Sequence, residues 1–387
     1  MSETSRIAVL HAACQPVTGP WSVMRDLALA QHASGRHAAV GIAVMRDGEW
    51  PATYRDEIRA TPLAFYESPC PDIFGTALFL HQYLRPPPWR WWIEDLAARA
   101  GTNRVVVHFH NAWMSGVYLP LPRIPGIRVG VAATFHGVNE HFHRKPVRRM
   151  IHRWMARRLV RHGARLTSVD GTNTEVAERV FGIPRAAFTV IPNGIQPTLV
   201  RAQPGGGVPG RPLVLGHVGS MIHQKGWHIL AEAAERINRN GTRIRIVMAG
   251  RGLEEDQVAE WARCHAEWAE YRGHTPNPRE RLMPELDALV LMSQWEGLPM
   301  SIIEAMSVGL PVIATDVGGV SDAVQPGRTG WLIPRTVDAL VATIEQALRE
   351  PARLRELGDA AHQRFTQHFT LERVAESYAT VYDGALA

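Results

Sequence analysis

The chain has 387 residues, of which 45% are apolar, 20% charged and 7% aromatic. This ordinary globular composition excludes a collagen-like or membrane-embedded chain, and the length predicts two domains, or three. Three scattered cysteines exclude a disulfide framework and a cysteine-type zinc site. No signal-peptide pattern and no apolar run of about 18 residues occurs, so we expect a cytoplasmic protein.

Charge is distributed unevenly along the chain. Residues 1–197 contain 23 Lys/Arg and 14 Asp/Glu, whereas residues 198–387 contain 19 and 23. An anionic partner would therefore meet the first half of the chain. Only two lysines, Lys145 and Lys225, occur beside 40 arginines, so each lysine calls for an explanation.

Apolar runs that alternate with helical periodicity predict an α/β fold. Residues 6–11 predict a buried strand, residues 22–34 a helix and residues 37–44 a second strand, which is the pattern of a parallel sheet. A loop is expected between the first strand and the helix, over residues 16–21. Further strands are predicted at residues 104–109, 129–135, 166–169, 212–218, 243–248, 288–291 and 311–314.

A stretch rich in glycine and proline, residues 195–211, predicts a flexible connector between two doubly wound domains. We predict an N-terminal domain over residues 1–197 and a C-terminal domain over residues 198–369. A last helix, at about residues 370–387, should pack back on the first domain. Ligands bind at the carboxyl ends of the strands in such sheets, so we expect a site in the cleft between the domains.

The densest functional signal lies in residues 293–320. Gly297 and Pro299 are residues that commonly start helices, so a helix should begin near Pro299 and offer its first N–H groups to an anion. Glu296 precedes this helix and Glu304 lies in its second turn, so both carboxylates can line one cleft and bind sugar hydroxyls. The alternative is a helix whose two glutamates are solvated.

Two further signals carry charge or a titratable group. The segment 215–226 places Lys225 between a strand and a helix, where a lysine suits a phosphate as a point charge. His136 follows the strand predicted at residues 129–135, where it would face the cleft. The alternatives are a surface turn with a solvated lysine and an ordinary loop histidine.

Taken together, these motifs resemble those of the retaining glycosyltransferases of family 4, which have the GT-B fold. The resemblance is carried by Glu296-x7-Glu304, residues 218–226, Ile191-Pro-Asn-Gly194, Tyr271-Arg-Gly-His274 and residues 310–319. It implies two Rossmann-like domains facing across a cleft. The implied reaction moves a hexose from a nucleotide-diphosphate sugar, such as a UDP-sugar, to a hydroxyl acceptor.

The resemblance also implies the setting of the reaction. The acceptor would be a lipid-linked glycan or a small molecule, in bacterial polysaccharide, glycolipid or glycosylated-metabolite biosynthesis. No cofactor and no nucleic-acid partner are implied. The chain has no Asp-x-Asp triplet, so a metal-bridged diphosphate is not expected.

By this likeness, the catalytic set comprises His136 beside the reacting sugar, Lys225 at the diphosphate and Glu296 at the donor hexose. Glu304 would bind the ribose hydroxyls. The other donor-binding positions implied are Gly19, Gly219, Ser220, Gly273, His274, Thr275, Gly297, Leu298, Pro299, Met300 and Ser301.

Two departures from the family pattern fall in the phosphate-binding loops. Ser220 stands where the family usually has an arginine, so one cation is missing. His217, His223 or a nearby arginine would have to replace it. Gly19 is followed by Pro20 where a second glycine is usual, so one backbone N–H is absent.

Weaker features leave alternatives open. Residues 144–165 hold nine Lys/Arg and no acid around an apolar stripe. Such a helix either binds an anionic membrane surface, which would make the protein peripheral on the inner face of the membrane, or has a solvated basic face. The aromatic stretch 86–92 fits acceptor contact or a domain cap. His108, His110 and His136, with His141 and His143, lack carboxylate partners at a suitable spacing, so no metal is expected.

Two other functions use the same architecture. A nucleotide-sugar 2-epimerase would bind the same donor class but need no acceptor, and a glycan-binding relative would not catalyse a reaction. The combination of Glu296, Glu304 and Lys225 favours the transferase.

Overall fold

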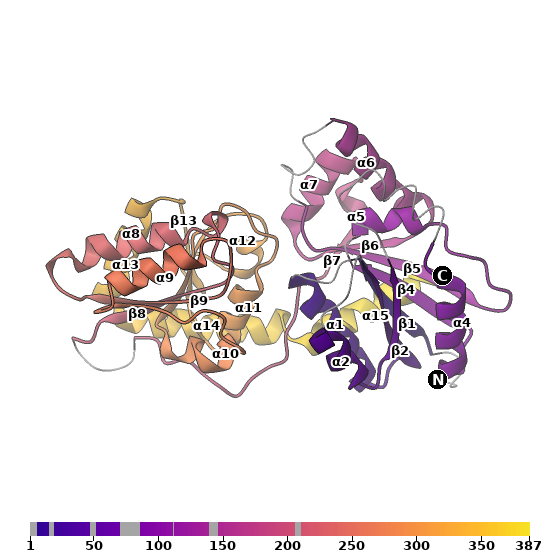
Figure 1. Ribbon diagram of the computed structural model, residues 1–387, viewed down its shortest axis with the longest axis horizontal. Helices are drawn as coiled ribbons and strands as arrows, with labels where there is room; N and C mark the ends of the chain where they lie inside the picture. The colour runs from indigo at the N-terminus through magenta and orange to yellow at the C-terminus, as the bar shows by residue number, and fades with distance from the viewer. Residues whose placement is uncertain are drawn as a thin grey trace. The chain divides into compact units, whose positions relative to one another are not determined.

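The computed structural model describes residues 6–14, 19–46, 52–69, 86–110, 112–138, 146–205 and 210–387. The chain divides into two compact units (Figure 1). The first comprises Met1–Gly194 with Leu371–Ala387, and the second comprises Ile195–Thr370. The division thus falls beside the stretch that the sequence marks as a connector.

The first unit is built on a seven-stranded parallel sheet with the order β3-β2-β1-β4-β5-β6-β7. The order reverses between β1 and β4, which makes this the switch point at which doubly wound sheets bind ligands. The strands are β1 (Ala8–Cys14), β2 (Ala39–Arg46), β3 (Ala64–Pro69), β4 (Arg104–His110), β5 (Arg128–Phe135), β6 (Arg165–Ser168) and β7 (Phe188–Val190).

Helices cover both faces of this sheet. Its helices are α1 (Gly19–Ala33), α2 (Ala52–Arg59), α4 (Trp89–Ala100), α5 (Ala112–Ser115), α6 (Pro146–Arg161), α7 (Gly171–Phe181) and α15 (Leu371–Ala385). One core joins Val107 of β4 to buried residues of α4, α6 and α7. Another joins Val9 and Val106 to Leu27 of α1 and Tyr382 of α15. The yellow α15 accordingly lies among the indigo and purple elements of the first unit (Figure 1).

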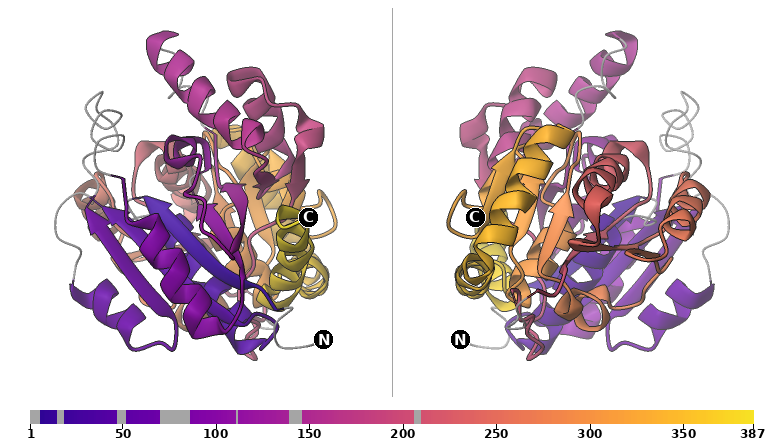
Figure 2. Two further views of the ribbon diagram at one scale, coloured as in Figure 1. Left: turned by 90° about the vertical axis from the view of Figure 1, so that its right-hand side faces the viewer. Right: turned by 90° about the vertical axis from the view of Figure 1, so that its left-hand side faces the viewer.

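The second unit repeats the arrangement with a six-stranded parallel sheet of order β10-β9-β8-β11-β12-β13. Its strands are β8 (Leu213–Val218), β9 (Ile244–Ala249), β10 (Ala269–Tyr271), β11 (Ala288–Leu291), β12 (Val312–Thr315) and β13 (Gly330–Ile333). Its helices are α8 (Trp227–Ile237), α9 (Glu255–Cys264), α10 (Pro278–Arg281), α11 (Met300–Ser307), α12 (Val320–Ala323), α13 (Val337–Arg349) and α14 (Pro351–His368). Helices flank its strands on both sides in the right-hand view of Figure 2.

Every strand predicted from an apolar run is present, with its limits shifted by three residues or fewer. Of the described strands that were not predicted, β3, β7 and β10 contain polar residues that interrupt the apolar pattern. β13 is apolar throughout, but no strand was assigned to it. The prediction of a loop up to Trp21 is wrong in part, because α1 already begins at Gly19. Pro20 fits there because the first helical turn does not need its N–H.

The structure also bears on the predictions for the connector and for the aromatic stretch. The described start of the connector is fixed to the second unit, because Ile195 N donates to Phe369 O and Ala202 N donates to Val308 O. The aromatic stretch 86–92 leads into α4, which begins at Trp89, and Trp89 and Trp92 are buried in the core. This burial favours the domain-cap alternative for those two side chains.

Candidate functional site

The predicted donor-binding positions of the second unit follow the carboxyl ends of its strands. Residues 219–226 follow β8, residues 272–275 follow β10 and residues 292–299 follow β11. Because all of these strands are parallel, the three loops meet at the same edge of the sheet. β8 and β11 are neighbours at the point where the strand order reverses.

Lys225 and Glu296 form a direct ion pair at this edge. Lys225 Nζ donates to both carboxylate oxygens of Glu296, at 2.6 and 2.8 Å, and Ser293 Oγ donates to the first of them at 2.6 Å. Glu296 is only 6% exposed, whereas the Lys225 side chain is 20% exposed. The predicted diphosphate cation and the predicted sugar-binding carboxylate are therefore neighbours that neutralise each other.

Two glycines allow the close backbone contacts that place this pair. Gly226, directly after Lys225, has φ +74°, and a Cβ there would lie 2.0 Å from Met292 O. Gly318 has φ +57°, and its Cβ would lie 1.9 Å from Glu296 O. Any larger residue would push the loops after β8, β11 and β12 apart.

The helix predicted to begin near Pro299 is confirmed. α11 starts at Met300, with Pro299 as its N-cap, and no side chain caps it. Its first turn contains no acidic residue, so an anion would meet the helix dipole without repulsion from the helix itself. Glu304 lies one turn further along and is half-buried.

The loop after β10 is tied to the loop after β9. Gly273 has φ +59°, and its carbonyl accepts a hydrogen bond from Gly250 N at 2.8 Å. Tyr271 O–H donates to Gly250 O at 2.6 Å. These contacts fix the backbone on which His274 and Thr275 are carried.

The structure excludes His217 as the replacement for the cation that is missing at Ser220. His217 is buried, and its Nδ1 donates to Val290 O at 3.2 Å. Burial lowers the pKa of His217 to about 4, so it is neutral at pH 7 and does not replace an arginine. Ser220 itself is exposed.

An arginine that the sequence did not single out lies against the same loops. Arg335 follows β13, and its guanidinium donates to Met292 O at 3.0 Å and to His223 O at 3.2 Å. It thereby connects the loop that carries Lys225 to the end of β11. No strand was predicted at residues 330–333, so Arg335 was not placed at the carboxyl edge of the sheet, although the apolar run Gly330–Ile333 could have indicated it.

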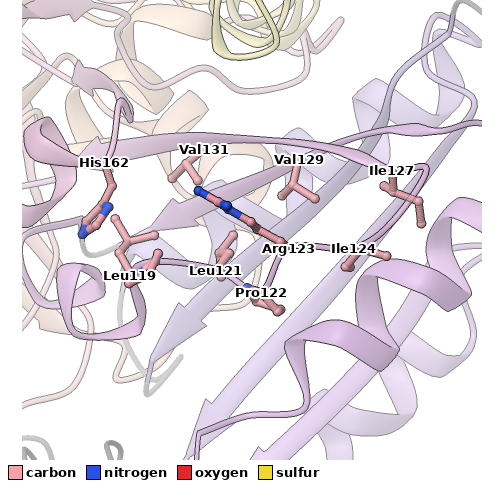
Figure 3. Close-up of a pocket in the computed structure, with 10 residues that line it drawn as sticks. Leu119, Leu121, Pro122, Arg123, Ile124, Ile127, Val129, Val131 and His162 are labelled. Carbon is pink, nitrogen blue, oxygen red and sulfur yellow. The ribbon is translucent and has the colours of Figure 1, made fainter.

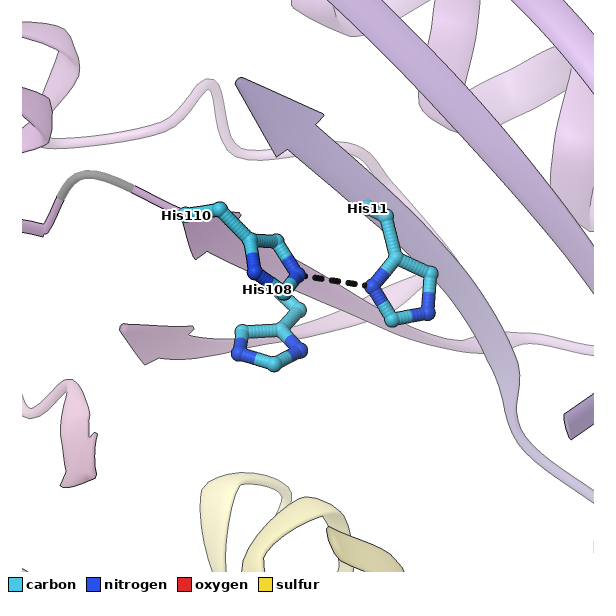
Figure 4. Close-up of side chains that lie close together, drawn as sticks. All are labelled: His11, His108 and His110. Atoms are coloured by element: carbon cyan, nitrogen blue, oxygen red, sulfur yellow. Dashed lines mark hydrogen bonds between the residues drawn. The ribbon is translucent and has the colours of Figure 1, made fainter. Parts of the chain in front are cut away.

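In the first unit, His136 directly follows β5 and joins a group of buried histidines. His136 Nε2 lies 2.9 Å from His110 Nδ1. His11, His108 and His110 lie close together (Figure 4). One ring nitrogen of each residue lies within 4.8 Å of one ring nitrogen of each of the other two. Burial lowers the pKa of His11 and of His136 to about 4. It lowers those of His108 and His110 well below the usual value.

Only part of this histidine group was identified from the sequence. His11 was not singled out, although it ends the apolar run that forms β1 and lies opposite His108 of β4. His141 and His143 lie outside the described residues. Gly19, expected to approach the phosphates, is the first residue of α1.

A cavity lies elsewhere in the first unit. A cavity of about 370 Å³ is bordered by residues 119–124, with Val129 and Val131 from the beginning of β5 (Figure 3). Arg123 and His162 add polar groups to its rim. Since His136 follows the carboxyl end of β5, this cavity lies at the opposite end of that strand and is separate from the candidate site.

The surface of α6 combines exposed apolar and basic side chains. Val147, Met150 and Trp154 are 63%, 65% and 40% exposed. Met155 and Leu159 of the same helix are buried in the core instead. The helix therefore has one apolar face toward the core and a second apolar strip toward solvent.

None of the helices in the described parts of the chain combines the length and the apolar character that crossing a bilayer requires.

Comparison with known proteins agrees with this architecture. The model "Glycosyltransferase Family 4" matches residues 17–199, and "Glycosyl transferases group 1" matches residues 202–364. Glycogen synthase of Mycobacterium tuberculosis is 32% identical over 232 residues, covering 58% of this chain and 55% of that protein. The 2-deoxystreptamine N-acetyl-D-glucosaminyltransferase of Streptomyces fradiae is 30% identical over 250 residues, 59% of each chain. The matches thus span little more than half the length of these curated relatives.

Among solved structures, Anabaena Alr3699/HepE in complex with UDP and glucose superposes with a TM-score of 0.71 at 18% identity, covering 98% of this chain and 99% of that one. Two doubly wound units with this likeness define a two-domain protein of the GT-B fold. The two family models extend the assignment over both units, and the chain belongs to the group 1 glycosyltransferases of family 4.

Proposed function

We propose that the protein is a retaining glycosyltransferase that moves a hexose from a nucleotide-diphosphate sugar to a hydroxyl acceptor. The observation that carries the proposal is the cluster at the carboxyl edge of the second sheet. There Lys225, Glu296 and the beginning of α11 follow the two strands that flank the switch point. A cation and a helix N-terminus suit a diphosphate, and two carboxylates suit sugar and ribose hydroxyls.

In the proposed reaction, the bond between the anomeric carbon and the β-phosphate oxygen breaks, and the acceptor oxygen bonds to the same carbon. Lys225 and the N–H groups at Met300 and Ser301 stabilise the negative charge of the departing nucleotide diphosphate. The acceptor hydroxyl gives its proton to the departing phosphate oxygen. Attack on the same face as the leaving group retains the anomeric configuration and needs no separate protein base.

We assign each predicted site residue to one part of the donor. Glu304 binds the ribose, Glu296 the donor hexose, and His136 of the first unit contacts the reacting sugar. The backbone at Leu298–Ser301 and at Gly219 meets phosphate, and residues 273–275 lie by the base. Gly19 and Ser220 complete the donor-binding set.

We further propose that the acceptor is met by the basic first unit, and that α6 binds an anionic membrane surface. The support is the exposed strip of Val147, Met150 and Trp154 beside exposed Arg149 and Arg153. Basic residues and aromatic side chains together favour the interface of an anionic bilayer. A lipid-linked acceptor would be reached from such a position, whereas a small-molecule acceptor would not require it.

A panel of UDP-glucose, UDP-N-acetylglucosamine and GDP-mannose, incubated without acceptor, tests the proposed class of reaction. Slow release of the nucleotide diphosphate, with a matching thermal stabilisation by the same nucleotide, supports a transferase. A ligand at ~100 Kd raises the free energy of unfolding by ~2.7 kcal/mol, which is readily measured. Formation of an epimeric nucleotide sugar would instead establish an isomerase, and binding without turnover a non-catalytic relative.

A further inference from the structure

A chain of hydrogen bonds between buried side chains ends at His136. It runs from Gln31 Oε1 to His11 Nε2 at 2.8 Å, from His11 Nδ1 to His110 Nε2 at 3.0 Å, and from His110 Nδ1 to His136 Nε2 at 2.9 Å. The contributing elements are α1, the neighbouring strands β1 and β4, and the end of β5. Figure 4 shows the central contact, between His11 and His110.

The amide of Gln31 sets the direction of this chain. Its Nε2 donates to Tyr382 Oη at 3.1 Å, so its Oε1 faces His11. An amide oxygen only accepts hydrogen bonds, so His11 Nε2 carries the hydrogen. Burial keeps His11 neutral, with its pKa lowered to about 4, so its Nδ1 is bare.

The same reasoning passes from ring to ring. Because His11 Nδ1 is bare, His110 Nε2 donates to it. Burial also keeps His110 neutral, so its Nδ1 is bare and His136 Nε2 donates in turn. A neutral imidazole has one donor and one acceptor, so a single amide orientation fixes the tautomers of three histidines.

A second arm of the network agrees with this direction. Tyr382 Oη accepts from Gln31 and is therefore free to donate to His108 Nδ1 at 2.9 Å. His108 Nε2 then donates to Thr134 Oγ1 at 2.6 Å. Thr134 also contacts Tyr378 Oη at 3.0 Å, a hydroxyl that is not on the arm leading to His136.

The arm to His136 ends on an unused acceptor. Nδ1 of His136 is shielded from solvent and makes no hydrogen bond within the described part of the chain. Asn193 interacts with the same ring, but an amide can donate or accept and so does not select a tautomer. The direction of this arm therefore rests on the amide of Gln31.

We propose that Gln31, His11 and His110 are positioning residues that hold His136 with its Nδ1 bare, so that this nitrogen accepts a hydrogen bond from a hydroxyl group of the bound sugar. The inference rests on the proposed function for the contact between His136 and the sugar. It assigns the histidine group to hydrogen bonding and not to a metal, because His11 and His110 bond to each other and their other nitrogens have protein partners.

Histidine-selective ¹⁵N labelling of the full chain tests the tautomer without any ligand. Long-range ¹H–¹⁵N spectra distinguish a protonated ring nitrogen from a bare one, and His136→Gln identifies the His136 signals among the 18 histidines. The expected result at pH 7 is a protonated Nε2 and a bare Nδ1 at His136. A protonated Nδ1 at His136 overturns the proposal, as does a stoichiometric metal in the purified protein.

Two variants then test the role of Gln31. Gln31→Met keeps the side-chain length but removes both amide contacts, so His136 should sample both tautomers. The kcat/KM for whichever of the three nucleotide sugars is turned over should fall roughly tenfold, the effect of one lost hydrogen bond. Tyr378→Phe is the matched control, because it removes a buried hydroxyl of the same network from the other arm. An unchanged His136 tautomer in Gln31→Met overturns the control by Gln31.

The outcomes separate this inference from the proposed function. Suppose that Nδ1 of His136 is bare and that His136→Gln has full turnover. This result would support the hydrogen-bonded chain but contradict its role at the sugar. If the protein turns over a nucleotide sugar but Nδ1 of His136 is protonated, the proposed transferase is supported and the proposed tautomer control is contradicted. Should Gln31→Met not fold, the spectrum of the unmodified protein still decides the direction.

Discussion

Lys225 Nζ lies 2.6 and 2.8 Å from the two carboxylate oxygens of Glu296, although the two residues are 71 positions apart in the chain. The carboxylate is almost fully buried, so the lysine is its charge partner as well as a candidate ligand for phosphate. A diphosphate that binds here has to share or take over this cation. If the donor binds here as proposed, the pair connects the stability of the second unit to that binding.

The first prediction concerns the loss of Lys225. Lys225→Met should reduce turnover by roughly 10²–10³, the effect of removing one preorganised charge stabiliser. It should also destabilise the second unit, because it leaves the Glu296 carboxylate buried without its partner. The double variant Lys225→Met/Glu296→Gln should recover stability but not turnover. Recovered activity in the double variant would show that Lys225 matters only as the partner of Glu296.

The second prediction separates the roles of the two glutamates. Glu304→Gln should weaken both the nucleotide sugar and the bare nucleotide, because the ribose is common to them. Glu296→Gln should leave affinity for the bare nucleotide intact or increase it, because it releases Lys225, while turnover falls. Calorimetry with UDP and GDP provides the comparison. Equal losses of nucleotide affinity in the two variants would contradict the division between ribose and hexose.

The third prediction concerns the glycine beside Lys225. Gly226 and Gly327 have φ +74° and +71°, but a Cβ at Gly226 would lie 2.0 Å from Met292 O, whereas nothing lies within 4 Å at Gly327. Gly327→Ala should therefore cost only the left-handed strain, about 1–2 kcal/mol of unfolding free energy. Gly226→Ala should cost more and reduce turnover, because the end of β11 has to move. Chemical denaturation of both variants makes the comparison, and equal costs would contradict it.

Much of the fold could be predicted because its strands are buried on both faces and appear as uninterrupted apolar runs. β7 lacks such a run, since Thr189 interrupts it and two of its three positions are exposed, whereas β13 is apolar throughout and was missed. The helix at Met300 and the placement of Lys225 followed from local residues at strand ends. The ion pair of Lys225 with Glu296 did not, because it depends on how β8 and β11 pair.

The histidine group shows the same limit more clearly. His11 and His108 could have been placed on neighbouring strands, but their partners come from distant helices. Tyr382 contacts His108 across 274 positions of the chain, and Gln31 appeared only as one residue of an amphipathic helix. Local periodicity contains no information on such contacts, so the tautomer of His136 could not be predicted.

The fourth prediction is a loss of stability in mild acid. Burial lowers the pKa of His11 and His217 from 6.5 to about 4, so each is neutral in the folded protein and charged after unfolding over this range. Unfolding then takes up protons, so stability falls as the pH drops from about 6.5 to about 4 and changes no further below it for these groups. Between these two pH values, each histidine lowers the free energy of unfolding by about 1.4 kcal/mol for every unit by which the pH falls.

Thermal unfolding at pH 7, 6 and 5 measures this dependence. His11→Gln, which removes one titrating group of the first unit, should reduce the slope of that unit, whereas His217→Gln should affect only the second unit. The same pKa values predict that none of these histidines changes charge between pH 7 and 8. A pH-independent melting temperature between pH 7 and 5 would contradict neutral burial.

The fifth prediction is salt-sensitive binding of α6 to anionic lipid. Its exposed strip places Val147, Met150 and Trp154 beside Arg149 and Arg153. Each basic residue near an anionic leaflet contributes about 1 kcal/mol, and the attraction falls off within a Debye length. The protein should therefore float with anionic vesicles at low salt, less in high salt, and not with neutral vesicles.

Charge reversal tests whether α6 is the surface responsible. Arg149→Glu/Arg153→Glu should reduce the bound fraction by at least about tenfold, because two attractive charges of about 1 kcal/mol each become repulsive. Arg349→Glu/Arg355→Glu, on α13 and α14 of the second unit, makes the same change in net charge at another exposed surface and should leave flotation nearly unchanged. Nucleotide binding should survive in both variants, because Arg149 and Arg153 lie in the first unit and Arg349 and Arg355 lie outside the loops assigned to the donor. Equal effects of the two reversals would mean that net charge, and not α6, determines binding. If the unmodified protein does not float with anionic lipid, α6 is a solvated wall of the first unit and a small, soluble acceptor becomes the favoured substrate.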